Sequence, residues 1–423
     1  MLLRKGGEKV RKFVEVFVLL IIAVLYIEGY KEISAAKADS VAITKENFPD
    51  KRVRKEISKS FDKNKDNILS TEELQGARKL DLGALEAATQ IRENINIKGI
   101  SKLKGITSLT IEADDVQNIS EIKKMPQLLI LRVDSMEEAI DILDFSKNVN
   151  LKELEIYADI RKIKLPNSKI LQYFTLEGSR IKDLFLNGFS ELKKIKLGYN
   201  SMQTISIANC PKLEKISSTE NEKIEKVILK KLPKLECLKI GSSKKFKKLK
   251  LPRLPEMREL VLGRNSIKKI DFKKMPNLRI LSVKRNNKIT KLDLRPLRKL
   301  HELTWQRGKL KKIRFGQKKN LEYMYLQHNR LGGTWKLSQF PKLDEFYCNY
   351  NRIKNIYGRN HKYLDGIECE HNRLKKLDLY NIEPGHIWFK GNPHVTAYLL
   401  HASSGHTYYR FDKSAKVHYK WKD

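Results

Sequence analysis

Oxygen-bearing residues recur at alternate positions of a short segment near the start of the chain. Asp, Asn and Asp stand at positions 1, 3 and 5 of a loop that begins at Asp62, and Ser and Glu stand at positions 9 and 12. Carboxylate, amide and carbonyl oxygens at this spacing are the ligands of a calcium-binding loop. The predicted Ca²⁺ ligands are Asp62, Asn64, Asp66, the carbonyl of Ile68, Ser70 through a water molecule, and Glu73.

Helical patterns flank this loop and predict an EF-hand-like helix–loop–helix. Val53, Ile57 and Phe61 recur every four residues before the loop, and Leu74 begins an exiting helix. Position 6 is Asn67 rather than the usual Gly, and Asn adopts the left-handed conformation less easily. An alternative interpretation is a degenerate helix–loop–helix that only covers the end of the next module.

A second group of residues suited to chemistry lies late in the chain. Its tyrosines alternate with apolar residues, which places them on the outward face of predicted strands. Tyr combines an apolar ring with a polar tip, so it suits protein contact or stacking on sugar rings. Ordinary strand preference is the alternative explanation. The candidate ligand-binding residues are Arg285, Arg307, Tyr323, Tyr325, His328, Tyr347, Tyr350 and His371.

These residues are carried by a repeat of the form L-x-x-L-x-L, often followed by x-x-N. Successive copies begin 20 to 23 residues apart. A fixed period of this size predicts a leucine-rich-repeat solenoid, which buries its leucines between stacked coils and leaves a long surface free. The copies begin at Leu128, Leu151, Leu171, Leu192, Leu213, Leu235, Met257, Leu278, Leu300, Leu321, Leu343 and Leu364.

Each repeat predicts two extended segments. Ile195 and Leu197 alternate with lysines in one strand, and Ile205 and Ile207 repeat that spacing on the opposite wall. About ten residues between the walls leave no room for a full helix. We therefore expect the α/β horseshoe class, with a parallel β-sheet on the concave face and an extended or irregular convex side.

Polar and sulfur-bearing residues occupy defined inward positions of the repeat. An inward Asn at the ninth position can bond the backbone groups of its own coil and the next. Cys348 and Cys369 share one inward position in adjacent coils, as buried thiols or, if the local geometry allows, as a disulfide. The ninth-position residues are Asn200, Asn221, Asn265, Asn286, Asn329, Asn351 and Asn372.

Composition shifts divide the chain into four predicted segments. Residues 1–38 join a basic start to an apolar run, Phe17 to Ile27, and an A-x-A site. We interpret them as a cleaved signal peptide that leaves no membrane span, with an uncleaved anchor as the alternative. Residues 39–88 form the EF-hand-like cap and residues 89–386 the repeats. In residues 387–423, Tyr409 and Tyr419 belong to two alternating stretches, which predict a β-hairpin cap.

The charge balance indicates a possible class of partner. The 423-residue chain has a formal net charge of +36, enough to attract polyanions. Paired lysines such as Lys247-Lys248, Lys268-Lys269 and Lys311-Lys312 would align into a basic ridge for an anionic cell-wall polymer such as teichoic acid, or a sulfated glycan. A solvated face is the alternative. The ridge lacks interleaved aromatic residues, so nucleic acid is not an expected partner.

Catalytic motifs are missing from the sequence. It contains no G-x-S-x-G, no H-E-x-x-H and no phosphate-binding glycine loop. We therefore expect a binding protein rather than an enzyme.

Several motifs resemble one family. Phe48-Pro49-Asp50, the loop from Phe61 to Glu73, the segment from Gly99 to Ile106 and the L-x-x-L-x-[LC]-x-x-N coils resemble secreted leucine-rich-repeat surface proteins of low-GC Gram-positive bacteria. More loosely, they resemble the internalin-like adhesins. The resemblance implies an extracellular or cell-envelope location and protein or glycan binding. The L-P-x-T-G sorting signal and hydrophobic tail that many members of this family carry are missing, so the resemblance leaves the mode of wall attachment open.

The sequence thus predicts an extracellular or cell-surface binding or adhesion protein whose repeat surface binds a protein or glycan. The alternative is a polyanion-binding envelope protein held by its basic surface.

Overall fold

The computed structural model describes residues 40–83, 94–167, 169–241, 243–401 and 407–421. The predicted signal peptide, residues 1–38, lies outside the described residues. The chain divides into two compact units, Met1–Glu138 with Asp144–Leu151, and Ala139–Leu143 with Lys152–Asp423. Each unit is described by itself.

The first unit begins with the predicted helix–loop–helix. Helix α2 (Lys51–Phe61) buries Val53, Ile57 and Phe61, as their spacing predicts. A second helix, α3 (Thr71–Gly76), follows the loop and begins with a capping box between Ser70 and Glu73. Between them, β2 (Ile68–Leu69) pairs antiparallel with β1 (Val41–Ala42).

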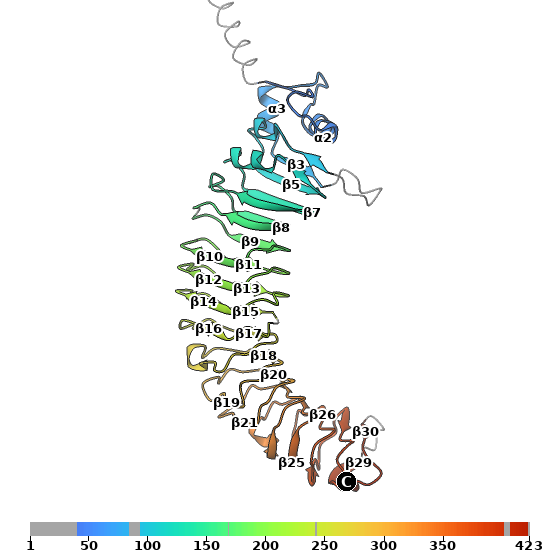
Figure 1. The fold of residues 1–423 in the computed structure, drawn as a ribbon. Helices are drawn as coiled ribbons and strands as arrows, with labels where there is room; N and C mark the ends of the chain where they lie inside the picture. Colours follow the sequence, from blue (N-terminus) through green and yellow to red (C-terminus); the bar gives the residue numbers. More distant parts are fainter. Residues whose placement is uncertain (1–39, 84–93, 168, 242, 402–406, 422–423) are drawn as a thin grey trace, which may run out of the picture. The chain divides into compact units, whose positions relative to one another are not determined.

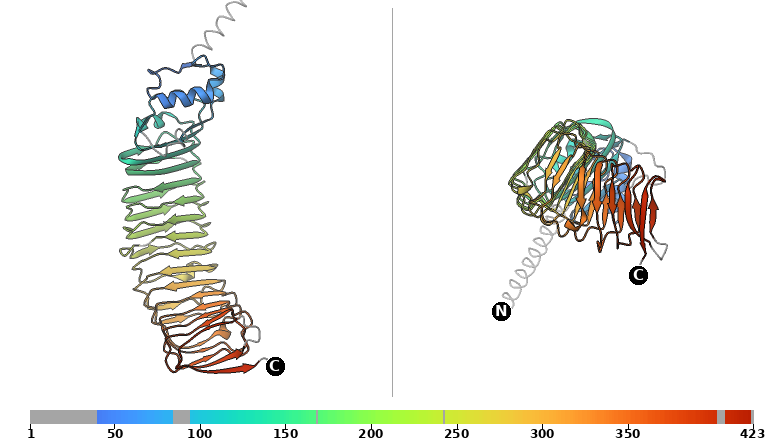
Figure 2. Two further views of the ribbon diagram at one scale, coloured as in Figure 1. Left: turned by 90° about the vertical axis from the view of Figure 1, so that its right-hand side faces the viewer. Right: turned by 90° about the horizontal axis from the view of Figure 1, so that it is seen from below.

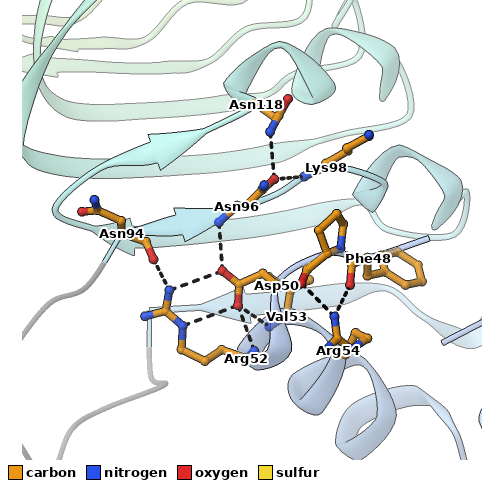
Figure 3. A network of polar contacts seen from close by, with 10 residues as sticks. Phe48, Asp50, Arg52, Val53, Arg54, Asn94, Asn96, Lys98 and Asn118 are labelled. Atoms are coloured by element: carbon orange, nitrogen blue, oxygen red, sulfur yellow. Dashed lines mark hydrogen bonds and ion pairs between the residues drawn. The ribbon is translucent and has the colours of Figure 1, made fainter. Parts of the chain in front are cut away.

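Asp50 connects α2 to the first coil (Figure 3). Its carboxylate accepts hydrogen bonds from Arg52 N (2.8 Å) at the start of α2 and from Asn96 N (3.0 Å) in β4 (Ile95–Asn96). Burial opposes ionisation, but these hydrogen bonds and the Arg52 guanidinium hold the pKa of Asp50 below its ordinary value. Arg54 donates to the carbonyls of Phe48 and Pro49. The Phe48-Pro49-Asp50 motif therefore attaches the helical segment to the coils of this unit.

The coils of the first unit pair in parallel. Strand β3 (Lys79–Leu82) pairs with β5 (Ser108–Ala113), which pairs with β7 (Ile130–Asp144). Strand β4 pairs with β6 (Val116–Gln117) on the other side, where the 3₁₀ turns η2 (Ile100–Lys102) and η3 (Ile119–Lys124) also lie. The sheet thus includes β3, which precedes residue 89, where we expected the repeats to begin.

The second unit contains a long parallel sheet with one strand from each coil (Figures 1 and 2). From β20 onward, the coils of this unit curve with the long sheet on the inner side (Figure 1). Its strands, in order, are β8 (Glu153–Lys164), β9 (Tyr173–Glu177), β11 (Lys194–Lys196), β13 (Lys215–Ser218), β15 (Cys237–Ile240), β17 (Glu259–Leu262), β18 (Ile280–Lys284), β20 (Glu302–Gln306), β22 (Tyr323–Tyr325), β24 (Glu345–Tyr347), β26 (Gly366–Glu368), β28 (His386–Trp388) and β30 (Tyr408–Arg410).

The opposite wall of this unit is built from shorter parallel sheets and 3₁₀ turns, which confirms the prediction of an extended or irregular side without full helices. One sheet contains β10 (Asp183–Asn187), β12 (Thr204–Ala208), β14 (Lys226–Lys230) and β16 (Lys248–Lys250). A second contains β19 (Lys291–Asp293) and β21 (Lys312–Arg314). The third contains β23 (Gly332–Lys336), β25 (Arg352–Tyr357), β27 (Lys376–Asp378), β29 (Thr396–His401) and β31 (Lys416–Trp421). The turns are η4 (Phe272–Lys274) and η5 (Leu337–Gln339).

Inward leucines and asparagines hold the coils together. Ile195 and Leu197 are fully buried, whereas the flanking lysines are exposed. Asn351 shows the polar contact: its amide donates to the carbonyls of Cys348 (3.0 Å) in its own coil and of Leu326 (2.8 Å) in the preceding coil. The predicted contact within the asparagine's own coil is thus confirmed, but the predicted contact with the next coil is wrong, because the side chain reaches back to the preceding coil. Cys348 and Cys369 are buried free thiols.

The predicted C-terminal β-hairpin is wrong. Strand β30 pairs in parallel with β28 in the long sheet, and β31 pairs in parallel with β29 on the opposite wall. The two alternating stretches are therefore the two walls of one more coil. Asp412 takes the place of the ninth-position asparagine, because its carboxylate accepts from Gly391 N (2.7 Å) and Asn392 N (3.1 Å) of the preceding coil.

Candidate ligand-binding surface

Outward side chains of the long sheet form rows that run across the strands from β20 to β28. One row runs through Glu302, Tyr323, Glu345, Gly366 and His386, which are register partners in successive strands. A second row, two residues further along each strand, runs through Thr304, Tyr325, Tyr347, Glu368 and Trp388. Strand alternation turns both rows outward, because the residues between them, such as Met324, Phe346 and Ile367, are fully buried in the core.

The rings of these rows contact one another. Ring centroids lie 6.5 Å apart for Tyr323 and Tyr325, 5.3 Å for Tyr325 and Tyr347, and 5.7 Å for Tyr347 and His386. The His386 and Trp388 rings are 5.0 Å apart. These separations fall within the range of favourable aromatic pairs. The five rings therefore form a continuous, half-buried aromatic surface.

Gly366 allows the rings to approach the backbone at the centre of this surface. A Cβ at residue 366 would lie 2.8 Å from His386 Cε1 and 3.2 Å from the Tyr347 ring and hydroxyl. Any larger residue would push both rings away from the sheet.

Six carboxylates, named at the end of this paragraph, surround the rings. We name the five rings together with these six carboxylates the acidic–aromatic surface. A third row, one residue before the first, begins at Glu322 and continues through Asp344 and Asp365; Asp344 N donates to Glu322 O, and Asp365 N donates to Asp344 O, at 2.9 Å each. The carboxylates are Glu302, Glu322, Asp344, Glu345, Asp365 and Glu368.

Neutral groups, rather than cationic side chains, contact most of these carboxylates. The Tyr325 hydroxyl donates to Glu345 Oε2, Asn349 Nδ2 donates to Glu368 Oε2 at 2.7 Å, and Gly385 N donates to Asp365 Oδ1 at 2.8 Å. Glu368 also lies 3.8 Å from His386 Nε2. In the described part of the chain, no Lys or Arg forms an ion pair with Glu302, Glu322, Asp344, Glu345 or Asp365.

Crowding of like charges shows in the pKa values of this surface. Burial, then the charges of Asp365, Glu345 and Glu322, raise the pKa of Asp344. The pKa of Tyr323 is raised chiefly by the Asp344 charge. Burial raises the pKa of Glu368.

The same sheet is basic further toward the N-terminus. Outward positions of β11, β13 and β15 hold Lys194, Lys196, Lys215 and Lys239. Lys196 pairs with Glu177 at 2.9 Å, and Lys239 pairs with Glu259 at 2.7 Å. The acidic–aromatic surface is therefore a local feature of the late coils.

A second group of predicted residues lies just beyond the strands. Here the backbone is left-handed, with φ between 51° and 57° for Arg285, Arg307, His328, Tyr350 and His371. The exposed rings of His328, Tyr350 and His371 stack on one another just beyond the strand ends. Their ring centroids are 4.5 Å apart in both pairs, His328–Tyr350 and Tyr350–His371. We name these five residues the edge ladder.

The structure thus divides the eight predicted ligand-binding residues into two sets. Tyr323, Tyr325 and Tyr347 lie on the acidic–aromatic surface, and the other five form the edge ladder. Sequence reasoning missed His386 and Trp388, although they flank the inward Ile387 in a degenerate coil and repeat its alternation. It also missed the carboxylates, which a row-by-row alignment of the coils reveals.

The predicted calcium loop has the turns that its motif requires. Asp62 Oδ2 accepts from Asn67 N (3.1 Å), and Asp66 Oδ1 accepts from Ile68 N (2.7 Å). Asn67 adopts the left-handed conformation with φ 61°, as position 6 demands. The other oxygen of Asp62, Oδ1, is buried and has no hydrogen-bond partner, which fits a position where a cation would bind.

Glu73 is held differently from the other predicted ligands. Its carboxylate accepts from Lys63 N (2.7 Å) and Ser70 N (2.9 Å), so it caps α3. Among the residues that the structure describes, no three His, Cys, Asp or Glu side chains gather closely enough to hold a metal ion. Calcium binding would therefore require Glu73 to exchange these hydrogen bonds for the ion.

The fold is that of a leucine-rich-repeat solenoid. Residues 255–302 match the family model described as leucine rich repeats (2 copies). No curated protein matches the sequence. Solenoids of this class are typically scaffolds that bind other proteins, and no catalytic family is indicated for this chain.

Many solved structures resemble the chain, and two of them illustrate the likeness. One is the functional domain of InlJ from Listeria monocytogenes, at 18% identity over 86% of this chain and 78% of that one, with a TM-score of 0.59. That domain is described as including a cysteine ladder. The other is the leucine-rich effector YopM from Yersinia pestis, at 16% identity over 78% of this chain and 89% of that one, with a TM-score of 0.52. At these identities the likeness is one of fold. None of the described helices is both long and apolar enough to cross a bilayer.

Proposed function

We propose that this chain is an extracellular or cell-surface protein that binds a protein or glycan ligand through the acidic–aromatic surface, with the edge ladder at its border. The observation that carries the proposal is the chain of ring contacts from Tyr323 through Tyr347 to Trp388 on one rigid sheet. The extracellular location rests on the family resemblance of the sequence.

Rigid aromatic side chains favour binding because they offer large contact areas and lose little entropy on association. The hydroxyl of Tyr325 is fixed by Glu345, and the ring of Tyr347 packs between Tyr325 and His386. These rings are therefore ordered before a ligand arrives. Pre-ordering reduces the free-energy cost of binding.

Capture from intact cells tests this function. Immobilised full-length chain should retain a surface ligand that the Tyr325→Ala/Tyr347→Ala variant loses, because the variant removes the centre of the ring surface. A Tyr173→Ala/Tyr199→Ala variant is the matched control, since it removes two exposed tyrosines from other coils. Equal capture by wild type and the Tyr325/Tyr347 variant refutes the proposed site.

Binding of an anionic envelope polymer is a second candidate function. Lys226 and Lys248 are register partners on the opposite wall, as are Lys291 and Lys312. Such rows place cationic groups about 4.8 Å apart from coil to coil. Release of the protein from cell envelopes at high salt is expected for this mode. Retention at high salt argues against it.

We further propose that the loop from Asp62 to Glu73 binds Ca²⁺. The unpartnered, buried Oδ1 of Asp62 and the left-handed Asn67 support this assignment. Bound calcium would supply a fixed positive charge between α2 and α3, and its effect on stability is a prediction below.

A further inference from the structure

We propose that the acidic–aromatic surface binds a lysine- or arginine-rich segment of a partner protein. This inference rests on the proposed function and specifies the chemistry of the ligand. Three features of the described residues support it: uncompensated carboxylates, rings beside them, and a cationic side chain of the chain itself that is already held this way.

The carboxylates are the first feature. Glu322, Asp344 and Asp365 lie in adjacent coils, and their backbones are joined by hydrogen bonds at 2.9 Å. Like charges opposite one another destabilise a sheet. The chain has a formal net charge of +36, so cationic residues to neutralise this row are abundant, yet none is placed against it in the described structure. A cationic ligand would relieve the repulsion, whereas a neutral sugar would leave it and a polyanion would increase it.

The rings are the second feature. A Lys ammonium or Arg guanidinium binds favourably over the face of Trp or Tyr. Tyr323, Tyr325 and Tyr347 lie in the rows directly beside the carboxylates. The Tyr325 hydroxyl donates a hydrogen bond to Glu345. The apolar stem of a Lys or Arg could therefore lie on a ring while its charge meets a carboxylate.

Arg410 is the third feature. Its guanidinium lies over the Trp388 ring, 5.8 Å from the centroid, and its Nε is 3.3 Å from Glu370 Oε1. Arg410 comes from β30, at the edge of the acidic–aromatic surface. One cationic side chain is thus already bound between a ring and a carboxylate, which is the contact that we propose for the ligand.

The spacing of the rows suits an extended segment that crosses the strands. Strands lie about 4.8 Å apart, and an extended chain advances about 3.3 Å per residue. A segment of about six residues therefore crosses from β20 to β28. On this path it passes at least one carboxylate in every coil from β20 to β26, at Glu302, Glu322, Asp344 with Glu345, and Asp365 with Glu368.

Peptide binding to the full chain tests the inference. The probe is a dye-labelled peptide of about ten residues that alternates Lys and Ser, with blocked ends, and the readout is fluorescence anisotropy. We expect binding that weakens with added salt. A peptide of the same sequence with every Lys acetylated should not bind, because acetylation removes the charge.

Two variants with the same change in net charge locate the site. Glu322→Gln/Asp344→Asn/Asp365→Asn should weaken binding roughly ten-fold or more, because it removes the central row. Asp183→Asn/Glu222→Gln/Glu256→Gln, which neutralises exposed carboxylates elsewhere in the same unit, should leave the affinity within about two-fold of wild type. Thermal unfolding of both variants checks that they fold.

Three results overturn the inference. They are no binding of the lysine peptide by wild type, equal loss in both variants, and self-association of the chain that the first variant abolishes, which would assign the surface to a second copy. Capture of a cell-surface ligand that needs Tyr325 and Tyr347 would still support the proposed function in each case. The two proposals can therefore fail separately.

Discussion

Tyr325 in β22 donates its hydroxyl hydrogen bond to the carboxylate of Glu345 in the next coil. This contact joins the ring rows to the carboxylate rows and fixes both side chains in one geometry. Burial and this hydrogen bond raise the pKa of the Tyr325 hydroxyl well above its ordinary value. The contact therefore has a signature that titration can measure.

The first prediction concerns this hydrogen bond. In Glu345→Gln the pKa of Tyr325 should fall part of the way toward that of an ordinary tyrosine, because the negative charge is lost while burial remains. Ultraviolet titration of the tyrosines measures the change, with Glu222→Gln as a control remote from the rings. An unchanged titration curve in Glu345→Gln would mean that the contact does not form in solution.

The second prediction separates stability from binding at Asp344. Its folded-state pKa is raised, so the stability associated with its protonated form is present at low pH and is lost as the pH rises through that pKa. At neutral pH, Asp344→Asn should therefore raise the free energy of unfolding by a few tenths of a kcal/mol, seen as a slightly higher midpoint of thermal unfolding, while it weakens binding of the lysine peptide. Asp183→Asn is the control for both measurements. A less stable Asp344→Asn variant contradicts the charge crowding.

The same raised pKa sets a pH dependence for binding. As the pH falls, Asp344 and Glu368 take up protons at higher pH than ordinary carboxyl groups. Affinity for the lysine peptide should therefore begin to fall at a higher pH than ordinary carboxylates would allow, as followed by anisotropy across the acidic range. An affinity that is flat through this range contradicts a role for these carboxylates.

The fourth prediction tests whether the ninth-position asparagines hold successive coils together. Asn351→Ala leaves the carbonyl of Leu326 and the N–H of Leu331 without their side-chain partner. Loss of buried hydrogen bonds of this kind costs about 2 kcal/mol or more, so the midpoint of thermal unfolding should drop by several degrees. Asn355→Ala, which removes an exposed bond to Thr334, should change stability by less than about 0.5 kcal/mol. Equal losses of stability in Asn351→Ala and Asn355→Ala would show that the ninth-position asparagines do not hold the coils together.

The fifth prediction concerns Lys318, which is fully buried at a position where most other coils hold an apolar residue, such as Met275 or Phe340. Its ammonium donates to the carbonyls of Phe315 and Gln317, and burial lowers its pKa to about 8. Because the unfolded chain binds this proton more tightly, the cost of burying the charge shrinks as the pH rises from about 8 toward 10.5. The stability of wild type relative to Lys318→Met should therefore improve over this range, by on the order of 2 kcal/mol. A difference that does not vary with pH contradicts a buried ammonium.

Calcium provides a further expected outcome. Millimolar Ca²⁺ should raise the unfolding midpoint of the first unit in the full chain, and calorimetry should detect binding, because the ion binds the folded loop. Glu73→Ala should abolish both effects but also removes a helix cap. Asn64→Ala is therefore the second variant, since Asn64 lies outside both helices and should weaken binding with little loss of stability. Absence of binding heat in the wild type would refute the calcium site.

The repeat could be predicted from the sequence because its signal is local and periodic. Inward leucines and the ninth-position asparagines follow directly from the spacing. Gly308 stands at the ninth position of its coil, where a Cβ would lie 2.8 Å from Asn329 Oδ1 and 3.0 Å from the backbone oxygen of Asn286, so the neighbouring coils leave no space for an asparagine. The C-terminal hairpin was predicted wrongly because alternation within a strand does not reveal its pairing partner. Tyr409 and Tyr419 lie in different walls of one coil.

The candidate site was only half predictable for a similar reason. Outward tyrosines can be recognised one coil at a time, so Tyr323, Tyr325 and Tyr347 were found. The carboxylates can be recognised as one row only when the coils are aligned. Glu322, Asp344 and Asp365 are each more than twenty residues apart in sequence, and the strand register makes them neighbours. Trp388 lies in a degenerate coil in which Pro384 takes the place of the first leucine, and its outward position beside the inward Ile387 was overlooked.

Oxidative footprinting of the captured complex tests the central claim most directly, because it reports which rings a ligand covers. The ligand should slow oxidation of Tyr325, Tyr347 and Trp388 and leave Tyr173 and Tyr199, which are exposed in other coils, unchanged. Protection of Tyr173 and Tyr199, with the three late rings as reactive as in the free chain, would contradict the assignment of binding to the acidic–aromatic surface.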